Sequence, residues 1–246
     1  AAAFPELSPA ARRSLARRVY AHFGRVAADS LRLTAGGARA VLPLVRTVDG
    51  EPLLRALAAR GRGVIMVAGH HGNWELGAAW IAAAGVPIAA VVKPPSNPWV
   101  AAYIERGRRA MGIATIAMPD ARAAVPPALA AGRVVALVAD QGAMRGSTWA
   151  PFFGRPTKTA EGPGFFAART GAPVIFAGMI AEAGSGLEEF FGVGAAFDEM
   201  VNGTLRGAEA VGGLERLGGL HLVGPVGNVD DDGGVDLFDI AAGHRW

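Results

Sequence analysis

Residues 70–75 form a cluster of polar and aromatic side chains that could carry out acid–base chemistry. They follow an apolar run, residues 64–68, and His70 and Glu75 have four residues between them. Gly72 lies in that interval and gives the backbone freedom to fold back. A carboxylate within reach of an imidazole fixes its tautomer and raises its basicity, so His70 is a candidate general base for an alcohol proton. A histidine in such a place is commonly only a packing or surface residue. However, the chain has five histidines, and two of them are adjacent here in an aliphatic neighbourhood.

A second polar cluster, Asp140-Gln141-Gly142, follows another apolar run, residues 134–139. Both runs are expected to be buried strands of a parallel sheet. The carboxyl ends of such strands collect ligands and catalytic groups at one edge. The sequence therefore predicts that His70 and Asp140 open onto a common cleft.

Several other kinds of chemistry are disfavoured. The chain has no cysteine, which excludes disulfides and a thiol nucleophile. It has no His-Glu-x-x-His pattern, and we expect no metal and no cofactor. A Gly-x-Ser-x-Gly elbow is also missing, which disfavours a serine hydrolase.

The block Gly-His-x-Gly-Asn-Trp-Glu resembles the catalytic block of the lipid A biosynthesis acyltransferases. These lauroyl/myristoyl transferases are part of the lysophospholipid acyltransferase superfamily, whose common block is His-x-x-x-x-Asp. The resemblance implies that His70 is the base and that Glu75 orients it. It covers roughly residues 4–193, and its motifs are specific only in combination.

Two further blocks carry the resemblance. A basic residue, Lys93, precedes Asn97-Pro98 and a helix that bears a Gly-Arg pair, and Arg108 matches an arginine that the family needs for activity. Arg106 and Arg109 lie beside it, and the sequence does not decide which of the three points inward. Asp140 matches an aspartate required in the family, and we expect it to position either the arginine or the glycolipid.

Residues 149–159 contain the third block, Pro-Phe-Phe-Gly followed by threonines, and are expected to form a long loop. This loop could hold an acyl chain beside a phosphate, or simply pack over the core with exposed cations. The residues expected to bind substrate are Gly72, Asn73, Lys93, Asn97, Phe153, Arg155, Lys158 and Thr159.

The alternation of strand and helix patterns predicts an α/β fold with a mostly parallel central sheet flanked by helices. The resemblance implies that this fold is glycerol-3-phosphate acyltransferase-like. Helices are expected near residues 8–31, 53–60, 76–84, 98–111, 120–131 and 162–170, and strands near 64–68, 87–92, 112–117, 134–139, 174–180 and 187–193. Residues 1–200 are expected to form one domain. Residues 201–246 are expected to be a divergent tail in which the glycine-rich stretch 212–234 is weakly ordered.

The N-terminal helix is expected to be amphipathic and basic, starting at Ser8-Pro9. Its arginines could form an ordinary solvated face, contact an anionic membrane, or meet an acidic carrier protein. The net charge of +3 comes without any nucleic-acid-binding signature, so no nucleic acid partner is expected. No run of about 20 apolar residues predicts a transmembrane helix, so membrane attachment would depend on surface features.

Together the residues and the resemblance predict an O-acyltransferase that moves a fatty acyl group from a thioester donor to a hydroxyl of a membrane glycolipid. The resemblance implies that the donor is acyl-carrier protein or acyl-CoA. The resemblance favours a lipid A precursor, hence lipopolysaccharide biosynthesis, at the cytoplasmic face of the inner membrane. A phosphatidylinositol mannoside or another glycolipid is the alternative acceptor. A non-catalytic lipid- or carrier-binding module is the alternative from a different class.

Overall fold

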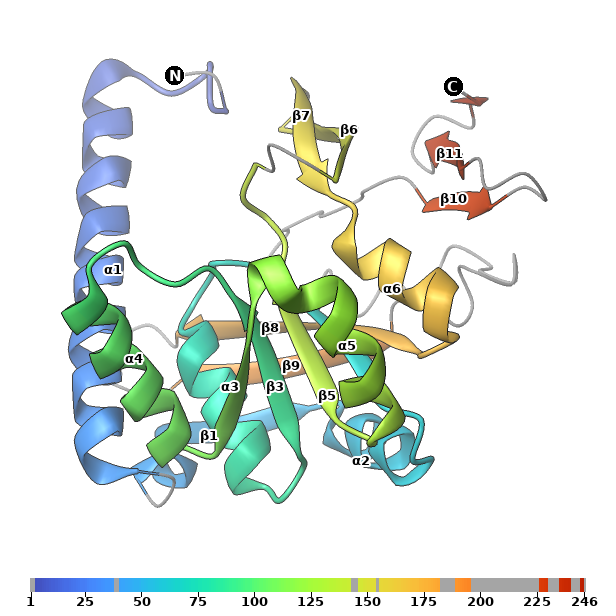
Figure 1. The fold of residues 1–246 in the computed structure, drawn as a ribbon. Coiled ribbons are helices and arrows are strands. Elements are labelled where there is room, and N and C mark those ends of the chain that lie inside the picture. The colour runs from blue at the N-terminus through green and yellow to red at the C-terminus, as the bar shows by residue number, and fades with distance from the viewer. Residues whose placement is uncertain are drawn as a thin grey trace.

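A computed structural model places a seven-stranded sheet at the centre of the protein, with helices on both of its faces (Figure 1). It describes residues 3–37, 40–142, 146–153, 155–181, 189–195, 226–229, 235–239 and 244–245. The strand order is β1-β9-β8-β2-β5-β3-β4. The five strands from β8 to β4 are parallel, whereas β9 is antiparallel to β8 and pairs in parallel with β1. The predicted α/β fold with a mostly parallel sheet is confirmed.

The helices and strands have the following bounds. The helices are α1 (Pro9–Gly36), α2 (Glu51–Ala59), α3 (Trp74–Ala83), α4 (Pro98–Ala110), α5 (Ala121–Ala130) and α6 (Gly162–Thr170), with 3-10 turns η2 (Leu42–Leu44) and η3 (Met118–Asp120). The strands of the main sheet are β1 (Val45–Asp49), β2 (Val64–Ala68), β3 (Ile88–Val92), β4 (Ile113–Ala117), β5 (Val134–Val138), β8 (Val174–Ala181) and β9 (Glu189–Ala195). Outside that sheet lie β6 (Ser147–Phe152), β7 (Arg155–Ala160), β10 (Val226–Val229), β11 (Val235–Asp239) and β12 (His244–Arg245).

Alternate residues of the central strands supply two separate apolar cores. Val64 and Met66 of β2 join the core under α2 and α3, whereas Ile65 joins the core under α5 and α6. This is the alternation that a strand covered on both faces requires. Helix α3 is buried from Leu76 to Ile81, which explains why its sequence is apolar and rich in small residues. The β2–β5 pair therefore lies in the rigid interior, and its carboxyl ends have a fixed separation.

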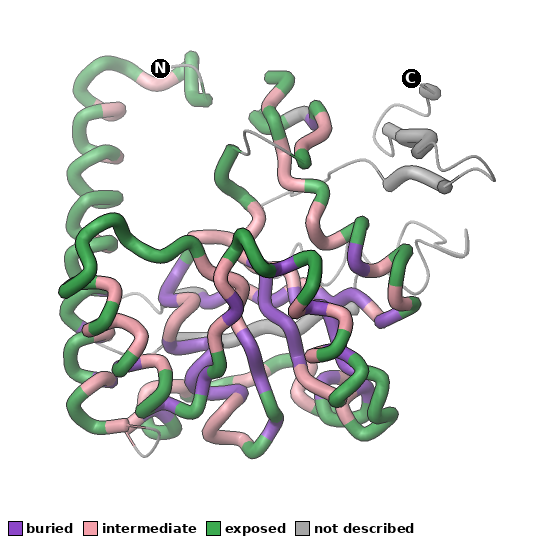
Figure 2. The backbone as a smooth tube through the Cα atoms, in the orientation of Figure 1, coloured by how far each residue is buried: buried purple, intermediate pink, exposed green. Residues whose placement is uncertain are grey.

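Helix α1 packs beside α4 along its C-terminal half only. Ser8 caps its first turn by accepting a hydrogen bond from the Ala11 amide, as the sequence predicts. Val26, Asp29 and Leu33 are its buried residues, and Thr34 lies against Gly107 of α4. The N-terminal half is exposed and extends past the carboxyl edge of the parallel strands (Figure 2).

The segment after β5 is a β-hairpin, so the prediction of a long loop over residues 149–159 is wrong. Strands β6 and β7 pair from Ser147–Ala160 to Phe152–Arg155. Phe153 follows β6 with φ of 50°, a backbone conformation that tight hairpin turns favour. The hairpin projects beyond the carboxyl edge of the sheet (Figure 1).

Other differences from the predicted elements are small. Strand β1 was not predicted, and the predicted strand at 187–193 is β9, of which residues 189–195 are described. Strands β10, β11 and β12 form a small antiparallel sheet. The rest of the tail, including most of the stretch 212–234, lies outside the described residues. In the described part of the chain, no helix has a stretch both long and apolar enough to cross a bilayer.

Candidate active site

The carboxyl ends of β2 and β5 bring His70 and Asp140 together, as the sequence predicts. The two strands are neighbours, with Ala68 paired to Val138. His70 and Asp140 each lie two residues beyond that pair, and the His70 Nδ1 is 2.7 Å from Asp140 Oδ1. Their side chains are 26% and 25% exposed, so the pair is accessible from solvent but partly shielded.

This contact settles the tautomer of His70. A carboxylate only accepts hydrogen bonds, so the proton of the neutral imidazole must lie on Nδ1, and Nε2 keeps its lone pair. The second oxygen of Asp140 accepts the backbone N–H of His70 at 2.8 Å. Asp140 also lies against Gly69, where a Cβ atom would be 3.4 Å from its Oδ2. One carboxylate thus orients both the ring and the main chain of His70.

Glu75 is paired with Arg108 and not with His70, which corrects the predicted partnership. Arg108 Nε donates to Glu75 Oε2 at 3.1 Å, and its Nη2 donates to Oε1. The side chains are 16% and 17% exposed, and each lies near a helix end that favours its charge: Glu75 in the first turn of α3, Arg108 in the last turn of α4. Asp140, and not Glu75, is the acidic residue that orients His70. Asp140 was expected to position either the arginine or the glycolipid, and the residue that holds the arginine is Glu75.

The three arginines of α4 are now distinguished. Arg108 is the one that points inward, to Glu75. Arg106 lies over the Tyr103 ring, and Arg109 is 79% exposed beside Glu105. A fork-shaped guanidinium held by a carboxylate is a fixed positive charge, which a lysine would not reproduce.

The turn between His70 and α3 is tightly enclosed. Gly72 has φ of 61°, and a Cβ atom there would lie 2.0 Å from the Met179 carbonyl oxygen of β8, so no other residue fits. Asn73 is fully buried and its Oδ1 accepts the Leu76 amide, so it caps α3 as predicted. Its Nδ2 has no hydrogen-bond partner among the described residues. Both residues were predicted to bind substrate, and the structure gives them a part in shaping the turn.

Helix α1 supplies a wall of the site that the sequence did not predict. His22 Nε2 lies 3.1 Å from the Gly72 carbonyl oxygen. Phe23 lies 6.1 Å from Trp74, ring centre to ring centre, and Trp74 lies 4.7 Å from His70 in an edge-to-face arrangement. Contacts between residues 50 positions apart leave no signal in local sequence, so His22 could not be found by spacing.

His71, the neighbour of His70, is close enough to His22 and Asp140 for their charges to affect it. Its pKa is lowered from the usual value, first by partial loss of hydration, and second by the nearby His22, while Asp140 acts in the opposite direction. His70, which has the required spacing to Glu75, is also the one that contacts Asp140.

The remaining residues that were predicted to bind substrate lie after β3, at the start of α4 and on the hairpin. Lys93 follows β3, on the other side of β5 from β2, and is exposed at the same edge. Asn97 caps α4 by accepting the Trp99 and Val100 amides. On the hairpin, Lys158 lies over the Trp149 ring, and the Thr159 hydroxyl donates to the Thr157 carbonyl. In the described part of the chain, no hydrogen bond or ion pair joins Phe153, Arg155, Lys158 or Thr159 to His70.

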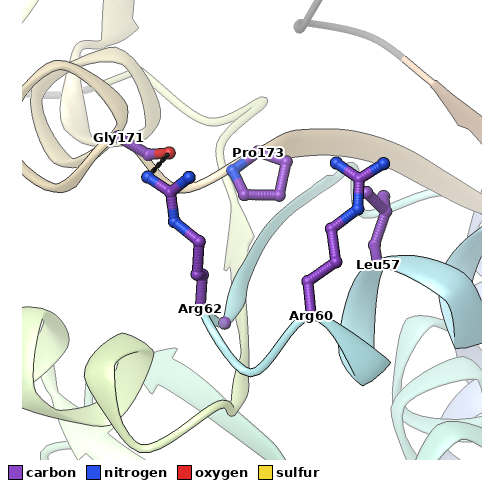
Figure 3. Close-up of a pocket in the computed structure, with 6 residues that line it drawn as sticks. Leu57, Arg60, Arg62, Gly171 and Pro173 are labelled. Carbon is purple, nitrogen blue, oxygen red and sulfur yellow. Dashed lines mark hydrogen bonds between the residues drawn. The ribbon is translucent and has the colours of Figure 1, made fainter.

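A shallow pocket lies at the opposite edge of the sheet (Figure 3). Gly63 and Pro173, which immediately precede β2 and β8, form part of its lining, together with Arg60 and Arg62. Arg62 donates to the Gly171 carbonyl at 3.4 Å. A five-residue strand separates this pocket from His70, so it does not belong to the same site. The described residues include no group of three or more side chains suited to a metal ion.

Comparison with known families fits the geometry of this edge. Residues 1–191 match the model of the bacterial lipid A biosynthesis acyltransferases. The chain belongs to this acyltransferase family. The match includes the five parallel strands from β8 to β4, the hairpin, and the residues His70, Glu75, Arg108 and Asp140.

Two relatives are phosphatidylinositol mannoside acyltransferases from Mycobacterium tuberculosis, strains CDC 1551 / Oshkosh and ATCC 25618 / H37Rv. Each is 28% identical to this acyltransferase-family chain over 163 residues, which are 62% of the chain and 50% of the relative. The chain thus matches about half the length of these relatives.

Proposed function

We propose that this protein transfers a fatty acyl group from a thioester donor, acyl-carrier protein or acyl-CoA, to a hydroxyl of a membrane glycolipid. The observation that carries the proposal is the hydrogen bond between His70 Nδ1 and Asp140 Oδ1. It leaves Nε2 of His70 free to accept a proton, which is what a general base for an alcohol needs.

The chemistry needs no metal or covalent acyl-enzyme. His70 Nε2 takes the proton of the acceptor hydroxyl as that oxygen attacks the thioester carbonyl carbon. The tetrahedral oxyanion then collapses, the carbon–sulfur bond breaks, and the imidazolium returns its proton to the leaving thiolate. Asp140 stabilises the imidazolium through its hydrogen bond to Nδ1, as the carboxylate of a catalytic triad does for its histidine. Such acid–base assistance contributes about 10²–10⁴-fold in rate.

Arg108 is the candidate for binding negative charge. Glu75 holds its guanidinium at the start of α3, five residues after the base. A positive charge in this position would stabilise the oxyanion or bind a phosphate of the acceptor. Lys93 at the end of β3, and Arg155 and Lys158 on the hairpin, would add positive charge around the acceptor.

Two acceptors each have support from one of the comparisons. The family model favours a lipid A precursor. The names of the two relatives favour a phosphatidylinositol mannoside. Both are glycolipids, so the same base, acting on an acceptor hydroxyl, would serve either one.

We further propose that the protein acts at the cytoplasmic face of the inner membrane. Support comes from exposed aromatic residues around the carboxyl edge of the parallel strands, which carries His70 and Asp140 and which we call the active edge. We call Phe4, Trp99, Trp149, Phe152 and Phe153 the aromatic rim; each is more than a third exposed. Phe4 contacts Phe153 edge-to-face, with ring centres 5.2 Å apart, so the N-terminal segment and the hairpin tip meet. Aromatic residues interspersed with arginines are typical of surfaces that bind anionic membranes.

The test is product analysis by mass spectrometry after incubation with labelled acyl-carrier protein or acyl-CoA and each of the two acceptors. We expect one ester product, and at least about 100-fold less of it per unit time with His70→Gln or Asp140→Asn. Asp49→Asn is the matched control, because Asp49 is exposed at the far end of β1, which runs opposite to β2. A parent protein that binds lipid or carrier protein but forms no product with any pair would favour the non-catalytic module.

A further inference from the structure

Helix α1 makes two separate contacts with the turn that carries His70. The first is the His22–Gly72 hydrogen bond, and the second is the series of ring contacts His22–Phe23, Phe23–Trp74 and Trp74–His70. The ring centres in this series are 5.8, 6.1 and 4.7 Å apart. The active turn is therefore held from outside the sheet by a helix that precedes it by about 50 residues.

The direction of the hydrogen bond is fixed by its partners. A carbonyl oxygen only accepts, so His22 Nε2 must carry the proton and donate it. The turn is enclosed on the β8 side, where the Met179 carbonyl lies against the Cα of Gly72. Glycine has the most backbone freedom of any residue. The movement of Gly72 is therefore limited by the two groups on either side of it, the Met179 carbonyl and His22 Nε2.

We propose that His22 is a positioning residue: by donating to the Gly72 carbonyl, it holds the His70 turn in the conformation that keeps the base against Asp140. The inference rests on the proposed acyl transfer for its effect on rate. A shift of Gly72 would rotate the peptide that leads into α3 and would move His70 relative to both Asp140 and Arg108. Catalysis is sensitive to displacements of about 1 Å in such groups.

Two substitutions separate the hydrogen bond from the bulk of the side chain. In His22→Gln the side-chain amide nitrogen replaces imidazole Nε2 at a similar reach, so the donor is kept. In His22→Asn the same amide is one methylene shorter and cannot reach Gly72. Ala21→Asn is the matched control, because it places asparagine at an exposed neighbouring position of the same helix.

We expect His22→Asn to lower kcat by about 10- to 100-fold with a much smaller change in KM, because the bond affects the base and not the substrate contacts. The Gln variant and the Ala21→Asn control should keep kcat close to that of the parent. Rates are compared below the lowest thermal midpoint of the set, so that a loss of folding does not count. The ¹³C resonance of the Gly72 carbonyl should shift in the Asn variant and stay in place in the Gln variant.

Three results would overturn the inference. One is parental kcat and an unshifted Gly72 resonance in His22→Asn. Another is an equal loss in the Gln and Asn variants, which would mean that the imidazole does something other than donate this bond. A parent that acylates no acceptor would refute the proposed function, and with it the effect of His22 on the rate. In that case the carbonyl resonance alone would still report whether His22 holds Gly72.

Discussion

At the scale of residues, the site consists of the His70–Asp140 pair and the Arg108–Glu75 ion pair. In neither pair is the partner the one that the sequence predicts, His70 with Glu75. Spacing along the chain favoured His70 with Glu75, because both lie in one short segment. The fold instead brings Asp140 from a neighbouring strand to His70, and Arg108 from α4 to Glu75. The exchange has a physical cause: Asn73 starts α3 at Trp74, so Glu75 lies on the first turn of a helix that faces α4. Each negative charge then has a partner on a different element.

The first prediction tests this exchange through stability. Glu75→Gln and Arg108→Gln should each lower the free energy of unfolding by about 1–3 kcal/mol, because each leaves a mostly buried charge without its partner. The double variant should lose less than the sum of the two. Urea unfolding of the two single variants and the double variant measures the coupling energy.

The matching cycle pairs Glu75→Gln with His70→Gln. Since the structure gives these residues different partners, their effects on unfolding should be additive within about 0.5 kcal/mol. A large coupling between positions 70 and 75 with none between 75 and 108 would restore the local pairing suggested by the sequence.

At the scale of elements, the strongly patterned segments were predictable and the tertiary pairings were not. The apolar runs 64–68 and 134–139, each with a polar cluster close behind it, predicted β2, β5 and the edge they share. Asn97-Pro98 predicted the start of α4 because capping is a local interaction. The hairpin was missed since its strands contain proline and charged residues, and only their pairing with each other makes them strands. Strand β1 was missed for a similar reason: it is short, half-exposed and pairs with β9.

The contact between α1 and α4 sets the position of Arg108 and gives the second prediction. A Cβ atom at Gly107 would lie 2.3 Å from the Thr34 hydroxyl oxygen and 3.3 Å from its Cβ. Gly107→Ala in a helix would ordinarily stabilise by about 1 kcal/mol. Here the steric overlap should outweigh that gain, with a net loss of about 1–2 kcal/mol.

Thr34→Ala provides the control, because it removes the hydroxyl and the methyl group that would clash. The Gly107→Ala/Thr34→Ala double variant should recover most of the stability that Gly107→Ala loses, as measured by thermal unfolding. Acyl transfer should follow the same order, since Arg108 is the next residue. Gly107→Ala that is more stable than the parent would mean that α1 does not pack on α4 in this way.

At the scale of the whole molecule, the active edge is surrounded by structures that extend away from the sheet. The N-terminal half of α1 lies on one side and the hairpin on the other (Figure 1). Phe4, which precedes α1, contacts Phe153 at the hairpin turn. Arginines along α1 and the hairpin cations lie near the aromatic rim in sequence. A surface with these residues would place the active edge against the lipid that contains the acceptor, so membrane contact and catalysis would use the same side of the protein.

The third prediction tests this orientation with vesicles that contain anionic lipid and no acyl donor. The double substitution Phe152→Ser/Phe153→Asn should weaken vesicle binding by at least about tenfold, because burying one phenylalanine contributes about 1.5–3 kcal/mol. Asparagine is chosen at position 153 because it tolerates the positive φ of that residue. Binding of the parent should also weaken as salt is raised, since the arginine contribution is screened.

Leu42→Ser is the control: Leu42 is also an exposed apolar residue, but it follows the far end of α1. Equal binding by the hairpin variant and the parent, or equal losses in the hairpin and Leu42 variants, would place the membrane contact on another face of the molecule.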